Sequence, residues 1–220
     1  MSSRILRDAK SGLLVDFGDA PEVDLRGLVR ALEGMANLEA GSIANSDEQR
    51  RVGHYWLRDS ERAPDAQTKE TIDACEAAIR ELSRGSHDTL LWIGIGGSAL
   101  GPQMLHGALQ NSEDPLTVHF LDNVDPHGIQ QTLNRIVPER TLVVVVSKSG
   151  GTVETRCAMD VSRAWWKRHD EPFAPHAIAI TGAGSILDRL AKEENWKASL
   201  PVWDWVGGRT SITGAVGQVL

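Results

Sequence analysis

The sequence predicts an α/β fold, a three-layer αβα sandwich with a five-stranded parallel sheet, preceded by a mainly helical N-terminal extension. From residue 89 onward, short runs rich in β-branched residues alternate with segments of helical periodicity. Strands that alternate with helices in this way form a parallel sheet with helices on both faces. The run TLVVVVS at 141–147 has no polar residue between its ends, which is typical of a strand buried on both faces.

Composition places the chain among ordinary globular proteins. Of its 220 residues, 41% are hydrophobic and 24% are charged. The formal charge of -7 does not favour nucleic acid as a partner, since nucleic-acid binding requires a basic face. No apolar run approaches the roughly 18–20 residues that a membrane span needs, and the first ten residues lack a secretory apolar region. We therefore expect a cytoplasmic protein without a membrane partner.

Residues 1–85 are predicted to form the mainly helical extension. We expect a short strand at 13–17 and a helix from Val23, because apolar residues then recur at helical spacing. The run 45–48, Asn-Ser-Asp-Glu, has the residue types of a helix start. A further helix is expected from Pro64 to about Gly85.

Residues 86–220 are predicted to form the α/β domain, truncated at its C-terminal end. The expected strands lie within 89–95, 117–122, 141–147, 176–181 and 199–205, and the expected helices within 99–110, 126–136, 152–168, 185–194 and from 210 onward. Leu220 lies inside the last helical pattern, without a glycine or a polar cap after it, which suggests that the sequence is truncated there. Parallel sheets bind ligands beyond the carboxyl ends of their strands, so the chemistry is expected at the strand-to-helix turns.

The first such turn, Gly94 to Pro102, contains four glycines. Glycines allow a ligand to approach the backbone closely, and the N-terminus of the following helix favours an anion. A rival interpretation is dinucleotide binding, because Gly94, Gly96 and Ala99 match G-x-G-x-x-G/A and Asp122 ends the next strand. This first turn leaves both interpretations open.

The third turn favours a phosphate monoester. It reads SKSGGTVET from Ser147 to Thr155. Ser147 and Ser149 are expected to point the same way at an extended strand end, and Thr152 and Thr155 to share a helix face. Four hydroxyls and several backbone N–H groups near one point suit a phosphate. A dinucleotide pyrophosphate, which needs only the first turn, leaves this second group of hydroxyls unexplained.

The fifth turn places a permanent cation next to two glycines. Gly207 and Gly208 precede Arg209, which stands at the start of the last helical pattern. A guanidinium there can donate to a sugar oxygen or stabilise a developing negative charge. The seven histidines show no H-x-x-x-H pairing, so no metal site is predicted.

Together, GIGGSALGP, SKSGGTVET and VWDWVGGRTS resemble the phosphoglucose isomerase family, in the same order along the chain. The resemblance covers most of the chain and implies a sugar-isomerase fold. It also implies interconversion of glucose 6-phosphate and fructose 6-phosphate in glycolysis and gluconeogenesis, without metal or organic cofactor. Family members are homodimers, and the implied substrate is a sugar phosphate.

The resemblance also assigns roles to single residues. The substrate-binding residues would be Gly97, Ser98, Ser147, Lys148, Ser149, Thr152, Thr155 and Gly208. Arg209 would stabilise the cis-enediol(ate), and Glu154 would orient a catalytic His. The family's catalytic Glu, its ring-opening His and a late Lys have no counterpart up to Leu220, so these 220 residues alone are expected to be inactive. The alternative function is a non-catalytic sugar-phosphate sensor with the same phosphate site.

Overall fold

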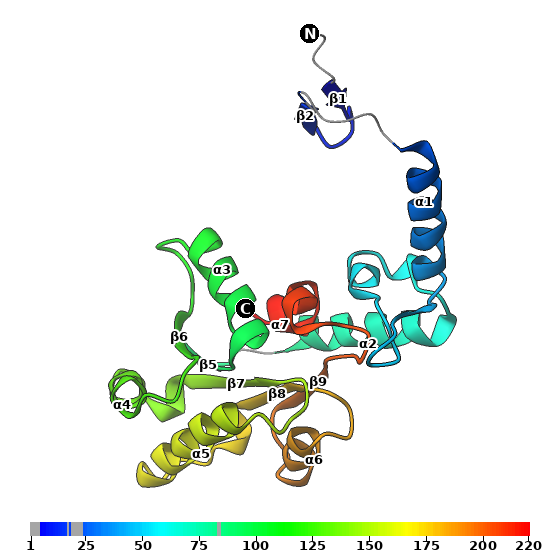
Figure 1. Ribbon diagram of the computed structural model, residues 1–220. Coiled ribbons are helices and arrows are strands. Elements are labelled where there is room, and N and C mark those ends of the chain that lie inside the picture. Colours follow the sequence, from blue (N-terminus) through cyan, green and yellow to red (C-terminus); the bar gives the residue numbers. More distant parts are fainter. Residues whose placement is uncertain (1–4, 17, 19–23, 83–84) are drawn as a thin grey trace. The chain divides into compact units, whose positions relative to one another are not determined.

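The computed structural model describes residues 5–16, 18, 24–82 and 85–220 (Figure 1). Its strands are β1 (Ile5–Arg7), β2 (Leu14–Asp16), β3 (Ile43–Asn45), β4 (Arg50–Arg51), β5 (Thr89–Ile93), β6 (Thr117–Leu121), β7 (Thr141–Ser147), β8 (Ala177–Thr181) and β9 (Ala198–Pro201). Its α-helices are α1 (Leu25–Glu39), α2 (Ala66–Glu81), α3 (Leu100–Leu109), α4 (Pro126–Leu133), α5 (Val153–Arg168), α6 (Ile186–Glu193) and α7 (Ala215–Gln218). The chain divides into two compact units, Met1–Asn37 and Leu38–Leu220.

The predicted five-stranded parallel sheet is confirmed. Its strand order is β6-β5-β7-β8-β9, and all neighbouring pairs are parallel. All seven residues of β7 are buried, which explains why its sequence is an unbroken apolar run between two hydroxyl residues. The first strand of the sheet, β5, lies between β6 and β7, so the strand order reverses between β5 and β7. Such a reversal is the usual place for a ligand in an open α/β sheet.

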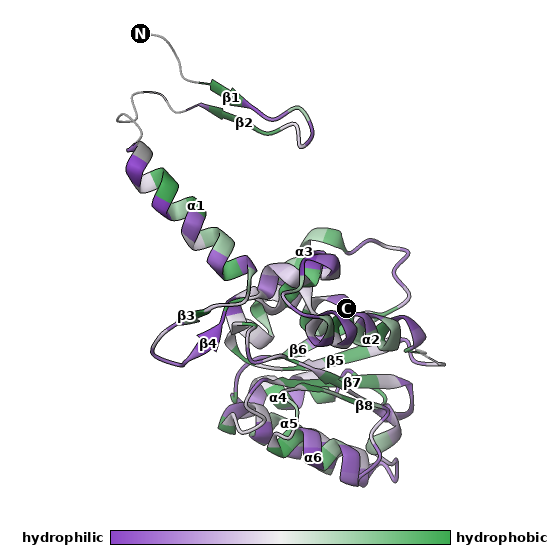
Figure 2. Ribbon diagram, turned by 90° about the vertical axis from the view of Figure 1, so that its right-hand side faces the viewer, coloured by the Kyte–Doolittle hydropathy of each residue, from purple (hydrophilic) through white to green (hydrophobic). Residues whose placement is uncertain are grey.

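Helices cover both faces of the sheet, as predicted. On one face, α4, α5 and α6 pack against the side chains of alternate strand residues such as Leu91 and Val143. On the other face, α2 and α7 pack against the residues between them, such as Leu90 and Val144. Figures 1 and 2 show these two helical layers with the sheet between them, and α3 lies on the same side as α2 and α7. The protein therefore has the three-layer αβα architecture.

The predicted domain boundary at 85/86 falls inside the second compact unit. Cys75 of α2 is buried in the same cluster as the sheet residues Leu90 and Trp92, so α2 is one of the helices of the sandwich. Asp65 caps α2 by accepting a hydrogen bond from the Thr68 amide. The end of the predicted helix includes residues 83 and 84, which lie outside the described residues.

The prediction of a helix start at 45–48 is wrong. Residues 43–51 form an antiparallel hairpin of β3 and β4 instead. The Asn45 side chain accepts a hydrogen bond from the Glu48 amide, 3.1 Å away, and Gln49 has a positive φ of 52°. A short polar side chain that bonds a nearby amide can cap a helix or close a turn, and here it closes a turn.

The first compact unit contains the hairpin of β1 and β2 and most of α1. The strand expected at 13–17 is present as β2, although Phe17 lies outside the described residues. The helix expected from Val23 is α1, and Val23 itself is also outside the described residues. The last predicted helix begins as a 3₁₀ helix, Gly208–Thr213, and becomes α-helical only after Gly214. Within the described ranges, no helix is both long and apolar enough to cross a membrane.

Candidate functional site

Two strand-to-helix turns meet at the edge of the sheet formed by the carboxyl ends of the strands, although they follow strands that are not neighbours. Gly97 lies in the turn after β5, and Gly208 begins the 3₁₀ helix after β9. The Ser211 hydroxyl donates to the Gly208 carbonyl at 2.8 Å and lies 3.4 Å from the Gly97 carbonyl oxygen. The chain that leaves β9 therefore returns across the sheet toward its centre, where strand order reverses.

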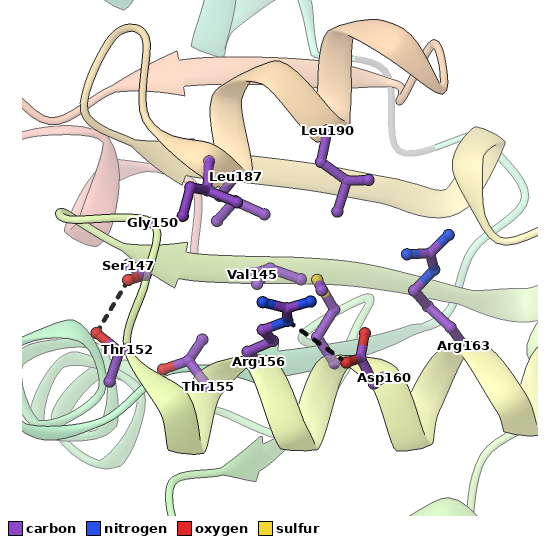
Figure 3. Close-up of a pocket in the computed structure, with 12 residues that line it drawn as sticks. Val145, Ser147, Gly150, Thr152, Thr155, Arg156, Asp160, Arg163, Leu187 and Leu190 are labelled. Carbon is purple, nitrogen blue, oxygen red and sulfur yellow. Dashed lines mark hydrogen bonds and ion pairs between the residues drawn. The ribbon is translucent and has the colours of Figure 1, made fainter.

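A group of hydroxyls, two of them on buried residues, lies at the carboxyl end of β7. The Ser147 hydroxyl is 3.1 Å from the Thr152 hydroxyl, and Ser147 is only 3% exposed. Thr155, also 3% exposed, lines the same pocket between α5 and α6. Figure 3 shows Ser147 and Thr152 joined at one end of this pocket, with Leu187 and Leu190 opposite α5. Three of the four predicted hydroxyls are thus brought together.

The N-terminus of α5 has donors available for an anion. Thr152 is the N-cap residue of this 16-residue helix, yet its side chain makes no capping hydrogen bond, because its hydroxyl is turned to Ser147. The first N–H groups of a helix have no partner within the helix, and the helix dipole makes this end attractive to negative charge. Hydroxyls and amides therefore face the same region.

Gly150 is required by the shape of this turn. Its φ is +68°, and a Cβ built on it would lie 2.6 Å from the Ser185 hydroxyl and 2.8 Å from the Leu187 amide nitrogen. Any other residue would push the turn away from α6. The glycine thus keeps Ser147 and Thr152 close to the start of α6.

Ser149 does not join the pocket in the way that the sequence suggested. The strand ends at Ser147, and the Gly150 amide donates back to the Ser147 carbonyl at 3.0 Å. The assumption of an extended chain beyond Ser147 is therefore wrong. Ser149 is exposed, and its hydroxyl accepts a hydrogen bond from the Gly151 amide at 3.2 Å. It remains on the same turn, but it does not line the pocket of Figure 3.

The turn after β5 is built by close backbone contacts. Gly96 has a φ of +57°, and the Ser98 carbonyl accepts a hydrogen bond from the Trp92 indole at 2.8 Å. Asp122, the carboxylate that would have to bind the ribose of a dinucleotide, already accepts hydrogen bonds from other side chains. Its two carboxylate oxygens accept bonds from Gln103 at 2.8 Å and Asn123 at 3.0 Å. This geometry gives the dinucleotide interpretation no support.

Lys148 and Arg209 line a second pocket together with Gly208. Arg209 is exposed and has no ion pair or hydrogen bond within the part of the chain that the structure describes. The Lys148 ammonium donates to the carbonyls of Asp204 and Val206, both at 2.8 Å. Burial lowers the pKa of Lys148 and the nearby Arg50 guanidinium lowers it further, while Asp204 and Glu48 act in the opposite direction.

Arg50 is a site residue that sequence reasoning missed. It lies on the β3–β4 hairpin and lines the same pocket as Lys148 and Arg209. Its guanidinium pairs with the Asp204 carboxylate at 3.1 Å and with Glu48 at 3.0 Å. No local pattern could have revealed this, because Arg50 and Asp204 are far apart in the sequence.

The remaining predicted residue, Glu154, is exposed in the first turn of α5 and does not line the pocket of Figure 3. Among the described side chains, no group of three or more His, Cys, Asp or Glu residues is placed to hold a metal ion. The donors of the site are hydroxyls, amides and cations, a set that suits an anionic oxygen ligand, and the carboxylates beside them, Glu48 and Asp204, are paired with Arg50.

Residues 33–220 match the family model described as Phosphoglucose isomerase. The chain belongs to the phosphoglucose isomerase family. It is 47% identical over 202 residues to a glucose-6-phosphate isomerase from Synechococcus sp. (strain JA-3-3Ab), a match that covers 86% of this chain and 38% of the relative. It is also 47% identical over 219 residues to one from Geobacter sp. (strain M21), covering 92% of this chain and 41% of that relative. The chain therefore spans about two fifths of the length of these curated relatives.

Solved structures agree with membership of the phosphoglucose isomerase family. A glucose-6-phosphate isomerase from Chlamydia trachomatis superposes with a TM-score of 0.75 at 31% identity, covering 89% of this chain and 40% of that protein. A hypothetical protein from Thermus thermophilus gives a TM-score of 0.65, also at 31% identity, with 88% of this chain and 43% of that protein covered. The sugar-isomerase fold that the resemblance implied is therefore confirmed.

Proposed function

We propose that this chain forms part of an enzyme that interconverts glucose 6-phosphate and fructose 6-phosphate through a cis-enediol(ate), in glycolysis and gluconeogenesis. One observation carries the proposal: the Ser147 and Thr152 hydroxyls lie 3.1 Å apart at the N-terminus of α5. Thr152 is the N-cap residue of this helix, but its side chain makes no hydrogen bond to the first helix amides. Such a group of donors suits a phosphate monoester. The names of the matched relatives support a sugar phosphate as the molecule that carries it.

In this proposal the phosphate binds Ser147, Thr152, Thr155 and the first amides of α5. Ser149 contributes through its exposed hydroxyl on the same turn. All of these are neutral donors. The arginines that line the same pocket, Arg156 and Arg163, are paired with Asp160 and Glu194, so hydrogen bonds and the helix dipole supply the attraction for the phosphate. The chain's formal charge of -7 makes a local site of this kind necessary, since the protein as a whole repels anions.

The sugar would extend from the phosphate toward Gly97, Ser98, Lys148 and Gly208. Arg209 would then donate to the oxygens of the enediolate as their negative charge develops. Its exposure, and the lack of a partner among the described residues, support this role over a structural ion pair. They also favour an enzyme over the alternative of a sugar-phosphate sensor, which needs no cation at the reacting carbons.

The general base is proposed to come from outside these 220 residues. The carboxylates that line the pocket of Arg209 are Glu48 and Asp204, and both are paired with Arg50. Glu154 is proposed to orient a catalytic His that the rest of the protein supplies. A homodimer, a cytoplasmic location and catalysis without metal or organic cofactor belong to the same proposal. The 220-residue chain alone is then expected to show no turnover in an aldose–ketose assay.

Titration of the chain with inorganic phosphate and with glucose 6-phosphate tests the proposal, with amide chemical shifts as the readout. We expect both ligands to shift the amides of residues 149–155, and the sugar phosphate to shift those of 97–98 and 208–209 as well. NADH serves as the control ligand. Shifts centred on Asp122 and produced by NADH alone would contradict the phosphate site.

A further inference from the structure

Lys148 connects the turn that carries the hydroxyls with the turn that carries Arg209. Its backbone follows Ser147 directly, so it belongs to the β7–α5 turn. Its Nζ donates to the Asp204 and Val206 carbonyl oxygens, both at 2.8 Å. An ammonium group has three donors and no acceptor, and two backbone carbonyls at this distance fix where it lies. The side chain thus holds a segment more than fifty residues further along the chain.

The segment that Lys148 holds is also anchored from the β3–β4 hairpin and its continuation. The Asp204 carboxylate lies 3.1 Å from the Arg50 guanidinium and 4.0 Å from the Lys148 ammonium. The Trp205 carbonyl accepts a hydrogen bond from the Gly53 amide at 3.1 Å. Residues 204–206 are therefore held on the hairpin side by bonds to Arg50 and Gly53. On the side of the β7–α5 turn, they are held by the two hydrogen bonds from Lys148.

Arg209 lies three residues after the end of this anchored segment. Trp203 and Trp205 stack on each other, with ring centroids 5.1 Å apart, so the segment has a fixed shape up to Val206. Val206 is 2% exposed and packs with Trp56. Gly207 and Gly208 then lead to Arg209. Movement of residues 204–206 would therefore move Arg209.

We propose that Lys148 is a positioning residue that couples phosphate binding at the β7–α5 turn to the placement of Arg209. The inference rests on the proposed function, because it takes the hydroxyl group of this turn as the phosphate site. A phosphate bound to Ser147, Thr152 and the α5 amides orders the turn, and Lys148 is ordered with it. Binding energy from the non-reacting phosphate is then used to hold the cation at the reacting carbons. The coupling is reciprocal, as linkage requires.

Amide hydrogen exchange of the 220-residue chain, with and without saturating inorganic phosphate, tests this role. In the unmodified protein, phosphate should slow exchange both at 149–154 and at 203–210. In Lys148→Met, the protection at 149–154 should remain and the protection at 203–210 should disappear. Without phosphate, residues 203–210 of this variant should exchange more than about tenfold faster, because two hydrogen bonds from a charged donor are lost.

Lys167→Met, which removes an exposed lysine near the C-terminal end of α5, is the matched control and should behave like the unmodified protein. Exchange of the β7 and β8 amides reports whether each variant is folded. Should Lys148→Met lose this core protection, Lys148→Gln keeps a donor for one carbonyl and is expected to show a partial loss of coupling. Equal phosphate-induced protection of 203–210 with and without the lysine would overturn the proposal. Absence of protection at 149–154 in the unmodified protein would instead overturn the phosphate site itself.

Discussion

The backbones of Gly97 and Gly208 touch. A Cβ built on Gly97 would lie 2.4 Å from both the carbonyl carbon and the carbonyl oxygen of Gly208. No side chain stands between the turn after β5 and the start of the 3₁₀ helix that carries Arg209. Gly97 is thus needed for this close approach and not for an unusual φ, because its φ lies outside the left-handed region.

Gly97→Ala should therefore force the two turns apart. The added methyl group meets backbone atoms, which cannot rotate away as a side chain can, so we expect the free energy of unfolding to fall by about 1–3 kcal/mol. Urea unfolding followed by tryptophan fluorescence measures this loss. Gly107→Ala is the control, since a Cβ at this position in α3 meets nothing within 4 Å and alanine favours a helix. An equally stable Gly97→Ala protein would show that the turns separate without cost.

The strands of the sheet were predictable because each is identified by the residue types of one short continuous run. The runs at 89–93, 141–147 and 177–181 are buried on both faces, so their composition alone identifies parallel strands. The hairpin at 43–51 was not predictable in this way. The hydrogen bond from the Glu48 amide to the Asn45 side chain can form both at a helix start and in a turn. The hairpin also makes contacts with residues far away in the sequence, such as the ion pair of Arg50 with Asp204.

The group of hydroxyls at the start of α5, where we propose that phosphate binds, was predictable in part for the same reason. Ser147, Thr152 and Thr155 lie within one strand–turn–helix unit, whose periodicity places hydroxyls on one side. The role of Lys148 could not be seen, because its partners are carbonyls that any residue types at 204 and 206 would provide. Every residue has a backbone carbonyl, so contacts to such acceptors cannot be recognised from the sequence and are seen only in the folded structure.

Thr152→Val should weaken phosphate binding without unfolding the protein. Valine has the shape of threonine but no hydroxyl, and loss of one hydrogen bond to an ionised phosphate costs about 1.5–3 kcal/mol. The dissociation constant of inorganic phosphate, measured from amide shifts, should rise accordingly. In the full-length isomerase that we propose, KM should rise while kcat stays nearly constant, because the contact is the same in ground and transition states.

Thr117→Val is the control for this substitution, since Thr117 is exposed at the start of β6. Its phosphate affinity should equal that of the unmodified protein. An unchanged affinity in Thr152→Val would remove Thr152 from the phosphate site, and a large loss of kcat at constant KM would assign it a different role.

Asp188 should make the protein sensitive to acid. It is 4% exposed, and a hydrogen bond from Lys192 lowers the pKa of its carboxyl, with the Gly184 amide and the Ser199 hydroxyl lowering it further against the effect of burial. A carboxyl whose pKa is lowered by folding stabilises the folded state above its unfolded pKa of about 3.9. This stabilisation is lost as pH falls through the lower folded pKa.

Asp188→Asn should therefore reduce the free energy of unfolding by about 1.5–3 kcal/mol at pH 7, the usual cost of losing hydrogen bonds to a charged group. The difference from the unmodified protein should shrink as pH falls from about 5 toward 2. Urea unfolding at a series of pH values measures it. Asp160→Asn, an exposed carboxylate 3.7 Å from Arg156, should have little effect at any pH. A loss for Asp188→Asn that does not depend on pH would show that its charge is unimportant.

Arg209→Lys, in the full-length isomerase that we propose, should lower kcat far more than it raises KM. The backbone contact of Gly97 with Gly208 brings Arg209 to the centre of the site, where it has no partner within the described residues. A guanidinium offers a planar fork of donors that an ammonium cannot reproduce. Donors aimed at the enediolate become stronger as its charge develops, so they stabilise the transition state more than bound substrate. Loss of one such donor reduces kcat by about 10²–10³.

Steady-state kinetics in both directions measure this effect, with Arg135→Lys as the control because Arg135 is exposed beyond the end of α4. Binding of inorganic phosphate to Arg209→Lys should be normal, since the proposed phosphate contacts come from the β7–α5 turn. This separates the variant from Thr152→Val, which should show the opposite pattern. Near-normal turnover with lysine at position 209 would mean that a single positive charge suffices there. The planar fork of the guanidinium would then have no part in stabilising the enediolate.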